Sequence, residues 1–133
     1  MRFKLLTAAI ALLITQSALA ASDKQIPCPS VDALASVGVS EPMIYRGQAF
    51  GVEWKNDFNT KEVWTFVVGP LNVRSEDEIV KYANFHVSKL TYAGTSVMSG
   101  YYTRCEYEGP FGGVGAVAIT PVVHPDDMFK LVH

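Results

Sequence analysis

The sequence predicts a single α+β domain in which a mainly antiparallel sheet of four to five strands carries one long helix on one face, with a short helix near the N-terminus. Three observations lead to this prediction. Strand-like runs lie both before and after one strongly signalled helix, and the turns between runs are too short for several crossovers. The chain has 133 residues, 49% of them hydrophobic and 18% charged, which leaves room for one domain.

The first twenty residues have the pattern of an export signal. Arg2 and Lys4 give a basic start, residues 5–14 are largely apolar, and Ala18-Leu19-Ala20 supplies the small residues of a cleavage site. We therefore expect cleavage after Ala20 and a mature domain over residues 21–133. The apolar run is too short for a membrane anchor, so the expected product is exported, either periplasmic or secreted.

The charge of the mature chain argues against nucleic acid as a partner. Removal of Arg2 and Lys4 leaves nine basic (11 − 2) against 13 acidic side chains, a net charge of −4 with neutral histidines. The remaining Lys and Arg residues are scattered singly, whereas phosphate binding needs a local excess of them. The same scatter argues against an anionic membrane surface.

Two cysteines remain after export, Cys28 near the new N-terminus and Cys105 in the last third of the chain. In an oxidising compartment such a pair is more often a disulfide than a redox or metal site, and no C-x-x-C spacing is present. We therefore expect a Cys28–Cys105 bridge. The alternative is a nucleophilic cysteine paired with a histidine.

The first half of the mature chain contains a short helix and two strands. A polar lead over residues 21–29 is followed by Ser30, which is expected to cap a helix over residues 31–37 that Gly38 ends. Residues 50–54 alternate between apolar and other residues, as in a half-buried strand. Residues 62–68 are rich in β-branched and aromatic side chains, so the two runs are predicted to form a hairpin.

The clearest local signal is Ser75-Glu76-Asp77-Glu78, a capping box with acidic residues at the helix N-terminus. The helix is expected to run to about Leu90. Its apolar positions lie on one stripe at helical spacing: Ile79, Val80, Ala83, Val87 and Leu90.

Two strand-like runs follow, residues 97–108 and 114–120, joined by a glycine-rich connection over residues 109–113. Residues from about 122 look like a short C-terminal tail. Alternation through the first of these runs predicts that one set of side chains faces the core: Val97, Tyr101, Cys105 and Tyr107.

No constellation in the sequence supports catalysis, and we expect no enzyme. The glycine-rich stretch lacks the Lys-Ser or Lys-Thr of a phosphate loop, so a hairpin connection is the better interpretation. His124 with Asp126 and Asp127 could hold a cation, yet a metal site needs more convergent ligands than the tail supplies. No metal is therefore predicted.

A surplus of aromatic and methionine side chains suggests an apolar cleft for a flat ligand, although most of them could simply be core residues. A histidine or tyrosine in such a cleft could meet a heme iron. His86, beside Tyr82 at the edge of the helical stripe, is the best placed. A buried His86 that forms a hydrogen bond beside Tyr82 is the structural alternative. Tyr101 and Tyr102 are the next candidates, since adjacent strand residues point to opposite faces.

Several segments together resemble a family of small secreted proteins from Legionella and its relatives, of which some members are named hemin-binding protein. The resemblance covers nearly the whole mature chain. It lies in the early Cys28-Pro29, residues 64–70, Cys105-Glu106-Tyr107 and residues 116–121. It implies a periplasmic or secreted protein, with type II secretion as a candidate route and hemin binding as the activity. No family motif of iron ligands is carried over, and no C-x-x-C-H for covalent heme attachment is present.

Two functions of different classes therefore remain open. The first is a ligand-binding protein for hemin or another flat hydrophobic molecule. The second is an exported interaction protein without catalytic activity, which docks on a protein partner through an exposed sheet edge or its glycine-rich loop.

Overall fold

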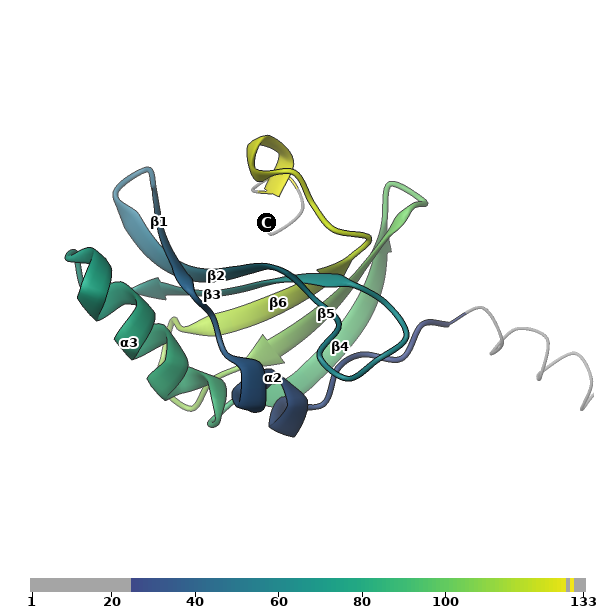
Figure 1. The fold of residues 1–133 in the computed structure, drawn as a ribbon, viewed down its shortest axis with the longest axis horizontal. Helices are drawn as coiled ribbons and strands as arrows, with labels where there is room; N and C mark the ends of the chain where they lie inside the picture. The colour runs from purple at the N-terminus through teal and green to yellow at the C-terminus, as the bar shows by residue number, and fades with distance from the viewer. Residues whose placement is uncertain (1–24, 129, 131–133) are drawn as a thin grey trace, which may run out of the picture.

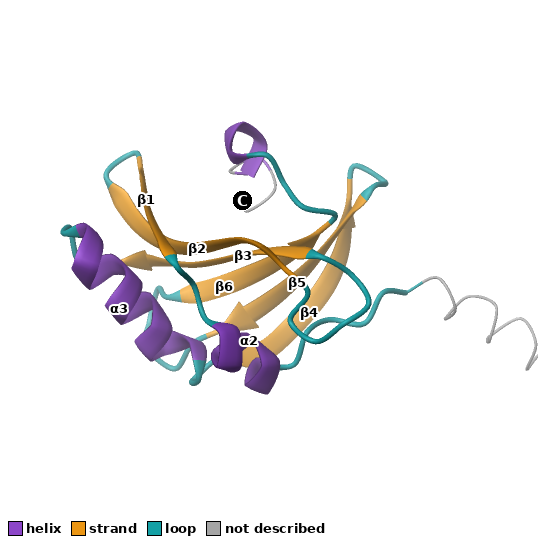
Figure 2. Cartoon of the chain, in the orientation of Figure 1, coloured by secondary structure: helices purple, strands orange, loops and turns teal. Residues whose placement is uncertain are grey.

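The computed structural model describes residues 25–128 and Lys130, so the export signal expected over residues 1–20 and its cleavage after Ala20 lie outside the described residues. Within these residues the fold is α+β, with a six-stranded sheet and two α-helices (Figures 1 and 2). Along the chain the elements are α2 (Val31–Val37), β1 (Glu41–Tyr45), β2 (Gln48–Asn56), β3 (Trp64–Leu71), α3 (Glu76–Val87), β4 (Thr91–Met98), β5 (Tyr102–Glu108), β6 (Gly115–Thr120) and the 3-10 turn η1 (Pro125–Asp127).

The expected α+β class is confirmed, but the expected count of four to five strands is wrong because two tight turns were missed. Arg46 and Gly47 both have positive φ and reverse the chain between β1 and β2. Ser99 and Gly100, also at positive φ, split the single run expected over residues 97–108 into β4 and β5. Such pairs of positive φ angles suit the twist of a two-residue hairpin turn.

The strand order is β1-β2-β3-β6-β5-β4, and every neighbouring pair is antiparallel. The predicted hairpin of the two early strands is confirmed as β2–β3, and the glycine-rich connection joins β5 to its neighbour β6. The chain leaves β3 in the middle of the sheet and reaches the edge strand β4 through α3. This helix therefore crosses one face of the sheet, as Figure 1 shows.

Both helices begin and end for local reasons. Ser30 accepts a hydrogen bond from the Ala33 amide and α2 ends at Gly38, as expected. Ser75 caps α3, accepting from the Glu78 amide at 3.4 Å and donating to the Glu78 carboxylate at 2.8 Å. α3 ends at Val87 rather than at about Leu90, although Leu90 is buried as the stripe predicts.

The helix face of the sheet holds the larger core. Ile79, Ala83 and Val87 of α3 are buried there, and Val80 is half-buried. Cys105 and Tyr107 of β5 are buried in the same core, which confirms the expected face for these two residues. Val97 and Tyr101 were expected in this core, but each is 67% exposed. Val97 pairs with Thr103 and therefore lies on the same face as Cys105, but it is exposed on the edge strand β4. Tyr101 lies in the β4–β5 turn, where the strand alternation ends.

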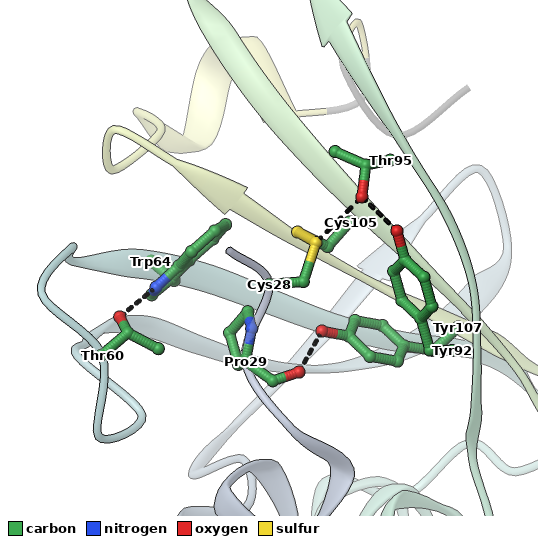
Figure 3. Close-up of a disulfide and its surroundings, with 8 residues drawn as sticks. All are labelled: Cys28, Pro29, Thr60, Trp64, Tyr92, Thr95, Cys105 and Tyr107. Atoms are coloured by element: carbon green, nitrogen blue, oxygen red, sulfur yellow. Dashed lines mark hydrogen bonds between the residues drawn. A yellow bond between two sulfur atoms is a disulfide. The ribbon is translucent and has the colours of Figure 1, made fainter. Parts of the chain in front are cut away.

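The expected disulfide is confirmed: Cys28 and Cys105 are bonded, with their Cα atoms 5.8 Å apart. Figure 3 shows the bridge and the hydrogen bonds around it. The buried Tyr107 hydroxyl donates to the carbonyl oxygen of Pro29 at 2.6 Å. The bridge and this hydrogen bond together hold the segment before α2 against β5.

The opposite face of the sheet is curved, and we call it the trough. Both ends of the sheet bend toward the C-terminal segment, so that the β1–β2 and β4–β5 turns rise on either side of it (Figure 1). The residues expected as a tail pack here: Val123 and Met128 are buried among Phe50, Val67 and Ile119. Helix α3 and the C-terminal segment therefore cover opposite faces of one sheet.

Candidate functional site

An exposed aromatic patch lies where α3 approaches the β5–β6 connection. It is formed by Phe85, His86 and Lys89 from α3 and the residues just after it, with Phe111 from the connection, and we call it the α3 patch. Phe85 is 51% and Phe111 47% exposed. Large exposed apolar side chains that touch one another are a common sign of a binding surface.

The local structure explains how Phe111 reaches α3. The Val114 amide donates to the Phe111 carbonyl at 3.3 Å, and the Gly109 amide donates to the Val114 carbonyl at 3.2 Å. Gly113 has a φ of 86°, a conformation that favours glycine. These contacts close a compact turn that presents the Phe111 ring to the helix.

The rings of the patch contact one another closely. The His86 ring meets those of Phe85 and Phe111 edge to face, with centroids 5.4 and 5.5 Å away. Phe85 and Phe111 are near-parallel, at an interplanar angle of 21° and a centroid distance of 6.3 Å. The Lys89 ammonium lies 4.3 Å from the centre of the Phe85 ring. The patch thus combines flat apolar surfaces, an imidazole and a cation.

His86 is neutral at neutral pH. Partial burial lowers its pKa below the usual value of 6.5, and the positive charge of Lys89 lowers it further. Its Nδ1 is buried without a hydrogen-bond partner among the described residues. The expected alternative, a hydrogen bond that holds His86 beside Tyr82, is therefore not what the structure shows. A neutral imidazole is the form that binds a metal ion.

The four expected ligand residues fall into two groups at opposite ends of β5. Tyr82 lies one helical turn before His86 and is 43% exposed. Tyr101 and Tyr102 lie at the β4–β5 turn, with ring centroids 5.0 Å apart. Tyr101 is exposed, whereas Tyr102 packs against the trough. A single ligand at the α3 patch could therefore meet His86 and Tyr82 but not the tyrosine pair.

Phe85, Lys89 and Phe111 belong to the site but were not predicted from the sequence. Phe85 lies off the buried stripe of α3, and Phe111 lies in a connection interpreted only as a turn. Two exposed phenylalanines, one on a helix surface and one between glycines, were an available signal. Their contact joins residues 26 positions apart (111 − 85), which local patterns do not reveal.

The C-terminal residues considered as cation ligands, His124, Asp126 and Asp127, lie apart from the α3 patch. His124 Nδ1 is 3.6 Å from Asp126 Oδ2, and both side chains are largely exposed. No three His, Cys, Asp or Glu residues come together in a metal-binding arrangement within the described part of the chain.

Comparisons with known proteins leave the site without a precedent: no protein-family model, no curated protein and no solved structure matches this chain. Over residues 25–128 and 130, no helix is both long enough and apolar enough to cross a membrane. The disulfide is the kind of bond that persists in oxidising compartments.

Proposed function

We propose that this chain is an exported ligand-binding protein, periplasmic or secreted, that takes hemin or a similar flat hydrophobic molecule at the α3 patch. One observation carries the proposal: a neutral histidine contacts two exposed phenylalanine rings edge to face, and these rings stack on each other. A flat ring system gains apolar contact with such rings, and a neutral imidazole nitrogen is a common axial ligand of heme iron.

The surroundings of the patch match further features of hemin. Lys89, beside Phe85, supplies a positive charge for a carboxylate of the ligand. Tyr82 offers a second exposed oxygen one helical turn away. Coordination through Nε2 would leave the ring proton on the buried Nδ1, which lacks an acceptor. We therefore expect weaker coordination than from a histidine whose second nitrogen is hydrogen-bonded.

An absorption titration of the mature, oxidised protein with hemin tests this function. The wild type should give a saturable Soret change at one equivalent. His86→Ala should change the spectrum and weaken binding, and Phe111→Ala should weaken it by up to about tenfold through the loss of one ring contact. His124→Ala, an exposed histidine outside the patch, is the matched control and should behave as the wild type.

The titration has two adverse outcomes. A folded His86→Ala protein that binds hemin tightly, with an unchanged spectrum, removes His86 as the ligand. A wild type without saturable binding removes the hemin proposal altogether.

If the wild type does not bind hemin, the leading proposal becomes an exported protein that binds a protein partner. The observation that favours it is the edge strand β4, whose Tyr92 and Val97 are 51% and 67% exposed. An exposed strand edge can accept a further strand from a protein partner.

A further inference from the structure

The trough on the other side of the sheet is built largely of apolar side chains. Its buried floor includes Phe50 and Val52 of β2, Val67 of β3 and Ile119 of β6. Around them lie further half-buried methionine and aromatic side chains: Met43, Tyr45, Trp54, Met98 and Tyr102. Methionine and aromatic rings adapt well to apolar side chains of different shape.

The trough is occupied by the chain's own C-terminal segment, residues 122–128. Two apolar side chains anchor it, since Val123 is 2% and Met128 0% exposed. The polar residues between them, His124, Asp126 and Asp127, are exposed. The segment therefore lies on the sheet as a bound peptide would, with separate anchors pointing down and polar side chains pointing to solvent.

Few polar contacts between described residues hold the segment to the sheet. The Val123 amide donates to Thr65 Oγ1 at 3.0 Å. Further hydrogen bonds of the described part of the segment are internal: the amides of Asp126 and Asp127 donate to His124 Nδ1 and to the His124 carbonyl, and the Met128 amide donates to the Pro125 carbonyl. Within the described chain the segment does not extend the sheet as a seventh strand.

Open grooves follow the segment on both sides. One, of about 710 Å³, separates it from the β1–β2 turn and is lined by Arg46 and Tyr45 on the sheet and by Asp126 on the segment. The other, of about 490 Å³, lies toward the β4–β5 turn, between Asp127 and Tyr102. Asp126 of the segment thus shares the first groove with two basic residues, Arg46 of the β1–β2 turn and Lys130.

We propose that the trough is a peptide-binding groove, and that residues 122–128 are a resident occupant that a second peptide can displace. The partner is an extended acidic peptide in which an apolar, methionine-like side chain follows one or two carboxylates. The segment itself defines this chemistry, because it shows which side chains the floor accepts and which charge shares the groove with Arg46. This groove is on the opposite face of the sheet from the α3 patch and does not depend on hemin binding.

Displacement of a tethered occupant has a measurable consequence. A segment joined to its own groove competes at a high effective concentration, so a free peptide binds the wild type only in proportion to the fraction of molecules with an open groove. A substitution that expels the segment should therefore strengthen binding of the free peptide without changing the groove.

The test uses a fluorescent synthetic peptide with the sequence of residues 122–133 as the probe, added to the oxidised full chain. Met128→Asp places a charge on the apolar floor and should expel the segment, so this variant should bind the probe at least about tenfold more tightly than the wild type. Met128→Leu keeps the volume and should behave as the wild type. A probe carrying the same Met-to-Asp change should bind none of the proteins.

A folded Met128→Asp protein that binds the probe no better than the wild type overturns the proposal. If that variant does not fold, amide hydrogen exchange of the wild type tests whether the segment can leave the trough while the sheet stays folded. The Val123 amide should exchange at least about tenfold faster than the Ala118 amide of β6, because the segment opens while the sheet stays intact. Equal exchange at the two amides would show that the segment leaves only on global unfolding, and would also overturn the proposal.

Discussion

Burial and a neighbouring charge set His86 apart from His124. Both histidines follow an apolar or aromatic residue in the sequence, but His86 packs against two phenylalanine rings and its pKa is lowered, whereas the His124 side chain is largely exposed. The residue type alone therefore does not distinguish the candidate iron ligand from the other histidine. The surroundings do, because they keep the imidazole neutral and hold it in place.

The lowered pKa of His86 predicts a loss of stability in acid. His86 is protonated near pH 6.5 in the unfolded chain but only at a lower pH in the folded protein. Between these two pKa values the unfolded state therefore binds more protons. The contribution is fully present above pH 6.5, and it falls as the pH drops from 6.5 toward the lower pKa of the folded state.

Urea unfolding at about pH 7.5 and about pH 5.5 measures this effect. The wild type should lose more unfolding free energy between these values than His86→Gln does. His124 is present in both proteins, so it does not contribute to the difference between them. Equal losses would contradict the assignment of a lowered pKa to His86.

Among the elements, α3 is the one whose packing can be tested most directly. Ile79→Ala removes a fully buried side chain and should cost about 2–5 kcal/mol. Ser75→Ala removes the cap and should cost about 1 kcal/mol. Lys81→Ala, on the exposed side of the helix, should stay within about 0.5 kcal/mol of the wild type.

Chemical denaturation of the three variants gives these free energies. The loss of unfolding free energy should be largest for Ile79→Ala, smaller for Ser75→Ala and smallest for Lys81→Ala. A negligible loss for Ile79→Ala would mean that α3 does not pack on the sheet through the face described above.

Elements marked by short-range signals were predictable from the sequence. Ser30 and Ser75 each place a hydroxyl before a helix, and the apolar spacing of α3 identified its buried face. The β1–β2 turn was missed because Arg46 is not a usual residue for positive φ. The Ser99-Gly100 pair is a recognised turn signal, but it lies within a long run of β-forming residues that was taken as one strand.

Features that depend on distant contacts were not predictable in this way. The position of β6 between β3 and β5 follows from the pairing of strands far apart in the sequence. The same limit applies to the site: His86 and Tyr82 share a helix face and could be named together, whereas Phe111 reaches them only through the folded sheet. Val123 and Met128 looked like part of a tail because the floor that buries them comes from other strands.

Over the whole molecule, the disulfide joins the first described segment to β5, the strand next to the edge strand β4. Cys28 and Cys105 are 77 positions apart, and a closed loop of that size stabilises by roughly 4 kcal/mol in the chain-entropy description. The intact exported protein should weigh two hydrogens less than the reduced chain. Its urea midpoint should fall on reduction.

Alkylation under denaturing, non-reducing conditions provides the control for the disulfide. An exported protein with two freely alkylating thiols would contradict the bridge. An unchanged midpoint after complete reduction would show that the bridge forms but contributes little to the free energy of unfolding.

The sheet separates the two surfaces to which we assign binding. The α3 patch is on the helix side, and the trough with its C-terminal segment is on the other. A ligand on one side therefore has to be located as well as detected, since hydrophobic hemin could also enter the grooves of the trough. Tyr102, an expected ligand residue, lies on that side.

The most direct test of the central claim is to locate hemin on the folded protein by NMR. Paramagnetic hemin broadens nearby amide signals, and a diamagnetic zinc porphyrin of the same shape serves as the control. We expect broadening confined to residues 82–89 of α3 and its end and to residues 109–113 of the β5–β6 connection. Broadening centred on Met98, Tyr102 and Lys130 in the trough, or on no part of the sequence, would contradict the assignment of hemin to the α3 patch.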